Sequence, residues 1–158
     1  MTGPLRVALI AAIALAAAGC ASTPQASRAS DAEAKEFRPD PRSATLYVYR
    51  NDWPNEDAGE QSDSVLYVDQ RLIGSTLPGI FFVVRLRAGV HTLSGIAQDQ
   101  GHLTVEVRAG QLYFVSLNVV GGDSLFRRVP VDAGKSEVLA CCDLLETWAP
   151  GQRPFLQL

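Results

Sequence analysis

The segment from residue 102 to residue 108 most constrains the fold, because its apolar and polar side chains alternate without a break. Leu103, Val105 and Val107 fall on one side of an extended chain, and the residues between them are polar or charged. Successive side chains of a β-strand point to opposite faces, so this pattern predicts a strand with one buried face. Half-buried strands are typical of antiparallel sheets. We therefore expect mainly antiparallel β-structure.

Further segments of the chain are also rich in β-branched and aromatic residues. Together with the first, the predicted strands cover residues 44–50, 64–69, 79–87, 90–97, 102–108, 111–119 and 124–131. Short strands at regular spacing predict a β-sandwich. Arg87-Ala88-Gly89 and Arg108-Ala109-Gly110 each separate two predicted strands. We expect both to form hairpin loops with glycine in the left-handed conformation.

The spacing of apolar residues changes near the C-terminus from a period of two to a helical period. The apolar positions in this stretch are Val138, Leu139, Cys142, Leu145 and Trp148. They predict one helix of about three turns, starting near Asp132 or Ser136 and stopped by Pro150. Such a helix would cover an open face or edge of the sheet. The predicted fold class is mainly β, an antiparallel β-sandwich of about seven strands with one C-terminal helix.

Cys141 and Cys142 are neighbours in the sequence. A disulfide between adjacent residues closes a strained ring, and on the predicted helix the two side chains diverge by about 100°. The sequence therefore predicts two thiols, at least one of them buried as a small apolar side chain. A two-cysteine zinc or copper site is the alternative, although no further ligands are apparent.

The N-terminus resembles a lipoprotein signal. Residues 7–18 are all apolar, which is the length of a signal-peptide core and too short to span a bilayer. Gly19-Cys20 follows three alanines and resembles a lipobox, so we predict cleavage before Cys20 and lipidation of its thiol. Ala21 follows, which in proteobacterial lipoproteins implies sorting to the outer membrane. The alternative is an ordinary secreted protein in which Cys20 is incidental.

These patterns divide the chain into four parts. We assign residues 1–19 to the signal peptide, 20–43 to the lipidated cysteine and a flexible linker, 44–148 to the sandwich with its helix, and 149–158 to a tail. A flexible linker of about 20 residues reaches on the order of 25 Å. Within it, Ser30 and Glu33 have the spacing of a capping box, which predicts a helical turn or two before Phe37.

The charge of the chain argues against nucleic acid as a partner. The formal net charge is −3, and the predicted signal peptide carries only one of the basic residues, Arg6. Nucleic-acid binding needs a basic stripe, and anionic lipid headgroups attract basic segments. The expected membrane contact is therefore the lipid on Cys20, with no nucleic-acid partner.

Three stretches of the sequence resemble a known family. They read ATLYVYR from residue 44, SVLYVDQRLIGSTLPGIFFVVRLRAGVHTL from residue 64 and VRAGQLYFVSL from residue 107. Over residues 44–148 they resemble the bacterial lipoprotein family called domain of unknown function 2846, and the second stretch is similar to a PEGA-type surface module. The resemblance implies a small sandwich and an envelope location, and it supplies no catalytic residues. Asp69-Gln70-Arg71 replaces the usual Asn/Asp-Gly turn, which predicts a longer turn.

No set of residues has the spacing of a catalytic or metal site. The sequence has no Gly-x-Ser-x-Gly motif, and neither histidine has a Cys, Asp or Glu partner at ligand spacing. We expect His91 to tie down the turn at Gly89, and His102 to be solvated. The predictions are accordingly no enzyme activity, no cofactor and no metal.

The aromatic side chains suggest a binding surface. Alternation along the strands would turn some of them outward, and Trp53 lies in a polar loop. We predict that Tyr49, Trp53 and Tyr67 line a partner-binding face. The expected rim contacts are Arg50, Arg127 and Arg128.

The sequence thus predicts a location more sharply than an activity. We expect a lipoprotein anchored by Cys20, on the periplasmic face of the outer membrane. Its expected role is a non-enzymatic binding or structural module, with an envelope protein or a cell-wall component as partner. The alternative is a carrier or sensor of a small apolar ligand held between sheet and helix.

Overall fold

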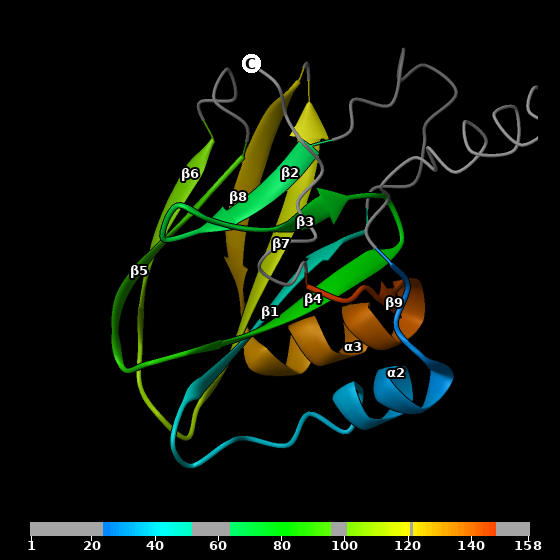
Figure 1. The fold of residues 1–158 in the computed structure, drawn as a ribbon, viewed down its shortest axis with the longest axis vertical. Helices are drawn as coiled ribbons and strands as arrows, with labels where there is room; N and C mark the ends of the chain where they lie inside the picture. Colours follow the sequence, from blue (N-terminus) through cyan, green and yellow to red (C-terminus); the bar gives the residue numbers. More distant parts are fainter. Residues whose placement is uncertain (1–23, 52–63, 96–100, 121, 148–158) are drawn as a thin grey trace, which may run out of the picture.

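The computed structural model describes residues 24–51, 64–95, 101–120 and 122–147, and two packed sheets form its centre (Figure 1). One sheet has the order β8-β7-β1-β4-β9 and the other the order β3-β2-β5-β6. The strands are β1 (Ala44–Arg50), β2 (Ser64–Val68), β3 (Arg71–Thr76), β4 (Ile80–Leu86), β5 (Gly89–Ser94), β6 (His102–Val107), β7 (Leu112–Val120), β8 (Asp123–Val129) and β9 (Asp143–Leu144). The helices are α2 (Arg28–Ala34) and α3 (Val131–Cys141).

The predicted fold class is confirmed. Each of the seven predicted segments forms a strand, and a C-terminal helix covers one face of the five-stranded sheet (Figure 1). Two strands were not predicted, β3 and β9. The five-stranded sheet is also mixed, because β1 pairs with β7, and β4 with β9, in the parallel direction.

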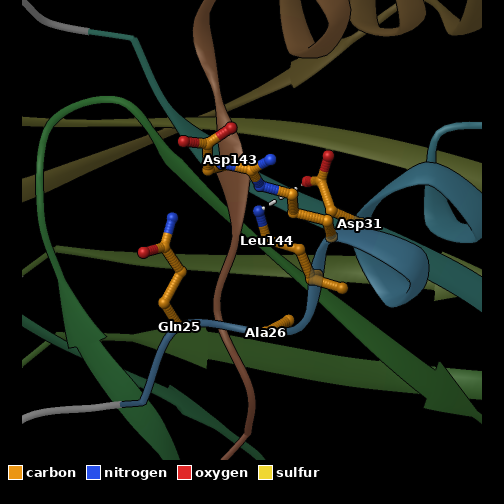
Figure 2. Close-up of a pocket in the computed structure, with 6 residues that line it drawn as sticks. Gln25, Ala26, Asp31, Asp143 and Leu144 are labelled. Atoms are coloured by element: carbon orange, nitrogen blue, oxygen red, sulfur yellow. Dashed lines mark hydrogen bonds between the residues drawn. The ribbon is translucent and has the colours of Figure 1, made fainter.

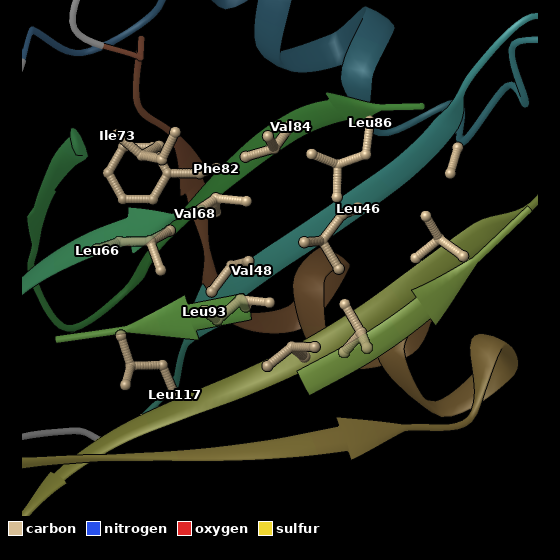
Figure 3. Packing of buried hydrophobic residues seen from close by; sticks show 14 of the residues in the cluster. Leu46, Val48, Leu66, Val68, Ile73, Phe82, Val84, Leu86, Leu93 and Leu117 are labelled. Carbon is tan, nitrogen blue, oxygen red and sulfur yellow. The ribbon is translucent and has the colours of Figure 1, made fainter. Parts of the chain in front are cut away.

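An aliphatic core fills the space between the two sheets. Leu46 and Val48 on β1 point into it, where they meet Leu66 on β2 and Phe82 on β4 (Figure 3). On β6, Val105 and Val107 are buried while His102, Thr104 and Glu106 are exposed, so the alternation predicted for this strand is confirmed.

The two Arg-Ala-Gly motifs are not hairpins, contrary to the prediction. The first leads from β4 to β5 and the second from β6 to β7, so each carries the chain from one sheet to the other. Gly89 and Gly110 both have a positive φ, of 145° and 78°. Glycine is needed where the chain changes sheet as well as where it folds back, so this local signal cannot distinguish the two cases.

The turn between β2 and β3 is also shorter than predicted. Val68 pairs directly with Arg71, which leaves Asp69 and Gln70 as a two-residue loop. Both have a positive φ, 50° and 63°, as a type I′ turn requires. Gln70 occupies a position that usually holds glycine, and its presence hid both the tight turn and β3.

The C-terminal helix has the predicted length of about three turns but ends earlier than predicted. It begins at Val131, close to the expected start, and ends at Cys141. The chain then runs beside β4, where Leu145 donates its backbone N–H to Phe81. Cys142 and Leu145 are buried as the helical spacing suggested, but they are buried on an extended chain that hydrogen-bonds to a strand edge. Trp148 lies outside the described residues.

The predicted flexible linker is packed against the domain from Pro24 onward. The expected helical turns before Phe37 form α2, and its N-cap is Ser27, not Ser30. Tyr47 donates its hydroxyl proton to the carbonyl of Ala34 at 2.8 Å, which holds the end of α2 against the sheet. Phe37 is buried and contacts Tyr47 edge-on. These contacts leave far less free chain than the assignment of residues 20–43 implied.

The strand assignment of β6 can be tested at its centre. We expect Val105→Asp to unfold the domain, because an unpaired buried carboxylate costs several kcal/mol against a total stability of about 5–15 kcal/mol. Thr104→Asp, on the exposed side of the same strand, should stay folded. Circular dichroism and thermal melting of both variants check this. A Val105→Asp protein that melts with the wild type would show that the side chain is not buried.

The contact of α3 with the sheet can be tested at Gly134. A Cβ there would lie 2.4 Å from the ring of Phe114. Alanine normally stabilises a helix interior by about 1 kcal/mol, whereas overpacking costs about 1–3 kcal/mol. We therefore expect Gly134→Ala to destabilise the protein in urea unfolding. Phe114→Leu should relieve part of this cost in the double variant, and a Gly134→Ala protein more stable than wild type would refute the contact.

Candidate functional site

An aromatic layer lies between the five-stranded sheet and the helices. Tyr47 stacks on Phe114 with ring centroids 4.8 Å apart, and Phe37 contacts both rings edge-on. Tyr49 is part of this layer and only 1% exposed. The prediction that Tyr49 lines a partner-binding face is therefore wrong, because the helices cover the side of β1 that alternation turns away from the aliphatic core.

A polar contact borders this layer. Tyr49 donates its hydroxyl proton to Glu137 on α3 at 2.8 Å, and the amide of Asn51 donates to the same oxygen at 3.0 Å. Burial, reinforced by the carboxylate of Glu137, raises the pKa of Tyr49, while burial raises the pKa of Tyr47 to about 12. Both phenols stay protonated near neutral pH, so their chemistry here is hydrogen-bond donation and not acid–base exchange.

The other predicted binding residues do not meet Tyr49. Tyr67 is partly exposed and packs with Val65 and Leu72 in a separate cluster. Leu66 and Val68, its neighbours on β2, point into the aliphatic core, so Tyr67 lies on the outer face of the four-stranded sheet. Tyr49 and Tyr67 therefore lie on opposite sides of the sandwich and cannot share one surface. Trp53 and Cys20 lie outside the described residues.

Arg50 is buried at the end of β1, 4% exposed, instead of forming a rim contact as predicted. Its guanidinium donates to the carbonyl of Thr76 at 3.1 Å. The hydroxyl of Thr76 donates in turn to the carbonyl of Ser64, whose own hydroxyl lies 2.7 Å from that of Ser124. This polar chain links strands of both sheets at one end of the sandwich, and its geometry supports a structural role.

His91 fixes the turn between β2 and β3. Its Nδ1 lies 2.5 Å from the carboxylate of Asp69, and its Nε2 lies 2.9 Å from the carbonyl of Arg87. Asp69 also accepts the backbone N–H of Thr92 at 2.9 Å. The expectation that His91 ties down a turn is confirmed, although the turn it holds is the one at Asp69 as well as the crossover at Arg87.

Both ring nitrogens of His91 face acceptors, so the doubly protonated ring satisfies both contacts. Burial alone lowers the pKa of His91, but the hydrogen bonds to Asp69 and to the Arg87 carbonyl, with the charge of Asp69, raise it overall. Burial alone would raise the pKa of Asp69, yet its bonds to His91 and Thr92 lower it overall. The pair therefore favours the charged form of each partner.

Cys141 and Cys142 are joined by a disulfide, contrary to the predicted pair of thiols. The prediction assumed that both residues lie on a helix. Instead α3 ends at Cys141, and Cys142 is the C-cap with an extended backbone, φ −130° and ψ 144°. The change of backbone conformation between the two residues removes the divergence that a continuous helix would impose. Cys142 is buried against the aromatic layer.

A polar pocket of about 520 Å³ lies where α2 meets β9. Gln25, Ala26, Arg28, Asp31, Asp143 and Leu144 line it. Figure 2 shows the carboxylate of Asp31 reaching the backbone N–H of Leu144, a bond of 2.9 Å. Lys35 pairs with the second oxygen of Asp31 at 2.8 Å and lies 3.6 Å from Asp143. The charges around the pocket are thus largely neutralised by each other.

Exposed apolar side chains gather on the hairpin formed by β7 and β8. Val120 is 61% exposed and Leu125 is 53% exposed. Asn118 pairs with Leu125, so Val120 and Leu125 are diagonal neighbours on one face of the sheet, followed along β8 by the exposed Arg127. We call Val120, Leu125 and Arg127 the hairpin patch. Arg128 points to the other face and donates to the carbonyl of Thr104 on β6.

The described residues contain neither a metal-binding cluster nor a membrane-spanning helix. No group of three or more His, Cys, Asp or Glu side chains in them could hold a metal ion. Neither α2 nor α3, the helices of the described part of the chain, is long and apolar enough to cross a membrane.

No family model matches the chain. The chain is similar to an uncharacterized protein of Haemophilus influenzae, with 29% identity over 137 residues. The alignment covers 83% of this chain and 79% of that protein. The similarity extends over most of both chains, and the name of the relative assigns no activity.

The contact between His91 and Asp69 predicts a pH-dependent contribution to stability. Because the pKa of His91 is raised, its contribution to the free energy of unfolding is complete below about pH 6.5. That contribution is lost as pH rises through the folded-state pKa. Because the pKa of Asp69 is lowered, its contribution to the free energy of unfolding is present above about pH 3.8. That contribution is lost as pH falls through the folded-state pKa. The contribution is therefore largest in weakly acidic solution.

The matched variants are Asp69→Asn and Glu33→Gln, each a change from carboxylate to amide. Asp69 is 48% exposed, so we expect Asp69→Asn to cost at most about 1 kcal/mol near pH 5.5, with a smaller loss near pH 9. Glu33 is exposed on α2, and its variant should keep the wild-type pH profile. Urea unfolding over a pH series measures this. Parallel profiles for wild type and Asp69→Asn would contradict the assignment.

Proposed function

We propose that this chain is a lipid-anchored protein of the bacterial cell envelope that acts as a non-enzymatic binding or structural module. The observation that carries the proposal is the sequence Gly19-Cys20 at the end of a short apolar run, in the position of a lipidation site. A diacylglyceryl group on Cys20 supplies two hydrocarbon chains, and two chains anchor a protein stably where one does not. We place the protein on the periplasmic face of the outer membrane because Ala21 follows Cys20.

The contacts between the folded domain and the chain that follows Cys20 support this proposal. Pro24 and Ala26 are hydrogen-bonded to Glu146 and Leu144, so the chain is attached to the domain only four residues after Cys20. A lipid at Cys20 would therefore hold the folded body directly, without a long spacer. Membership of the lipoprotein family that the sequence resembles stays part of the proposal.

The binding role rests on the hairpin patch. Its two apolar side chains are more than half exposed, and an arginine lies beside them. Exposed apolar patches mark interaction sites, and arginine is enriched in protein interfaces. We propose an envelope protein or a cell-wall component as the partner. A pull-down with the acylated protein tests this, with Leu125→Asp as the variant expected to lose the partner and Thr104→Asp as the control expected to keep it. Equal capture by Leu125→Asp would exclude the hairpin patch.

A carrier of an apolar ligand is the weaker candidate. Among the described residues, Phe37, Tyr47 and Phe114 fill the space between sheet and helix with stacked and edge-on rings. Gly134 also lies against Phe114 too closely to admit a Cβ. The pocket between α2 and β9 is lined mainly by polar and charged side chains, which suits a hydrocarbon ligand poorly.

The anchor is tested by Cys20→Ser. We expect this variant to move from the membrane pellet to the soluble fraction, because loss of the thiol removes the site of acylation. Its domain should fold, since Cys20 precedes Pro24, where the described contacts with the body begin. The control is the double variant Cys141→Ser and Cys142→Ser, which removes the other two cysteines. This protein should remain in the membrane pellet. Intact-mass analysis of the purified wild type should find the acyl chains on an N-terminal Cys20; an unmodified N-terminus would refute the proposal.

A further inference from the structure

We propose that the surface around Pro24 is the side of the domain that faces the lipid bilayer, and that the edge formed by β8 points away from it. This inference rests on the acylation of Cys20 in the proposed function. We call this side the anchor surface; its exposed members are Pro24, Gln25, Arg28, Asp143 and Glu146.

The anchor surface is fixed to the body by backbone pairing. Ala26 donates its N–H to the carbonyl of Leu144 at 3.0 Å, and Glu146 donates its N–H to the carbonyl of Pro24 at 2.9 Å. Gln25 and Leu145 thereby form an antiparallel bridge. The segment that enters the domain is consequently held at its edge by this bridge, which restricts its motion relative to a free linker.

Side-chain contacts also hold the segment from Pro24 to Phe37 against the domain. Asp31 on α2 accepts the backbone N–H of Leu144, and Lys35 joins Asp31 by an ion pair of 2.8 Å. Beyond α2, Phe37 is buried in the aromatic layer beneath the sheet. Releasing the whole segment from Pro24 to Phe37 would therefore break contacts at several points along α2.

The remaining tether is short. Four peptide steps separate Cys20 from Pro24, and a fully extended chain spans at most about 3.6 Å per residue. Pro24 therefore lies within about 14 Å of the acylated cysteine, whatever the conformation of the residues between them. A reach on the order of 25 Å, expected for a linker of about 20 free residues, is excluded by the packing of α2.

The strand order decides which part of the domain lies far from the bilayer. Pro24 and Ala26 bond to the chain at and just after β9, which is one edge strand of the five-stranded sheet. The other edge strand is β8, four strand spacings away, or roughly 19 Å. Arg28 and the hairpin patch thus lie at opposite edges, and the tether brings only the first of them to the lipid.

The charges of the anchor surface give no competing reason for this orientation. Lys35 lies between Asp31 and Asp143, so its charge is compensated. The exposed Arg28 is outnumbered by the exposed and acidic Asp143 and Glu146, so the anchor surface does not favour anionic headgroups. The length of the tether, and not electrostatic attraction, therefore sets which side faces the bilayer.

Photocrosslinking of the acylated full-length protein tests the orientation. A benzophenone amino acid replaces Arg28 in one sample and Arg127 in another, both exposed arginines, and the protein is reconstituted into vesicles of phosphatidylethanolamine and phosphatidylglycerol. We expect at least fivefold more phospholipid adducts at position 28 than at position 127. The ratio should persist in about 1 M salt, where charges are screened beyond about 3 Å.

A matched variant carries a flexible Gly/Ser insertion of about twelve residues between Thr23 and Pro24. It should pellet with the vesicles as the wild type does, while the ratio of adducts falls toward one because the lengthened tether no longer restricts the domain. Equal adducts at both positions of the wild-type tether, or a ratio unchanged by the insertion, would overturn the orientation alone. Protein that does not pellet with vesicles would overturn the anchor, and the orientation with it.

Discussion

The structure depends on covering both faces of β1. All seven of its residues are buried, with aliphatic side chains toward the second sheet and aromatic side chains toward the helices. Each large side chain contributes about 1.5–3 kcal/mol when it is fully removed from water. The five-stranded sheet is therefore stable only as the middle layer of three. It needs the four-stranded sheet on one face and the helices α2 and α3 on the other.

The three layers are closed at their margins by polar contacts. Arg50 bonds across the sheets at one end, Arg128 reaches from β8 to β6, and His91 holds the turn at Asp69. Buried polar groups must find partners, because an unpaired donor or acceptor loses its hydration without compensation. The sequence predicted Arg50 and Arg128 as rim contacts of a binding face and His91 as a turn contact. The bonds of all three join parts of the chain that are distant in the sequence.

The packing of α2 changes how the proposed anchor can act. A free linker would let the domain sample many orientations. Under the proposed acylation of Cys20, a body held from Pro24 would instead present a defined side to the membrane and the hairpin patch away from it. The covalent length of the tether and the hydrogen bonds at one sheet edge would set this preference. A partner that recognises the hairpin patch would approach from the aqueous side.

The sequence by itself determined the strands with clear alternation, the start of α3 and the lipobox-like site at Cys20, because each depends on residues adjacent in the chain. It could not reveal β3, since Gln70 stands where the turn signal would be glycine, nor β9, which extends over only two residues. Only the tertiary structure decided that the glycine motifs change sheets, that Tyr49 is buried while Tyr67 lies on the opposite side, and that Pro24 joins the edge of the sheet. The reason is physical. Alternation along a strand predicts which side chains share a face. Whether that face is buried depends on the elements that pack against it, and those elements come from distant parts of the chain.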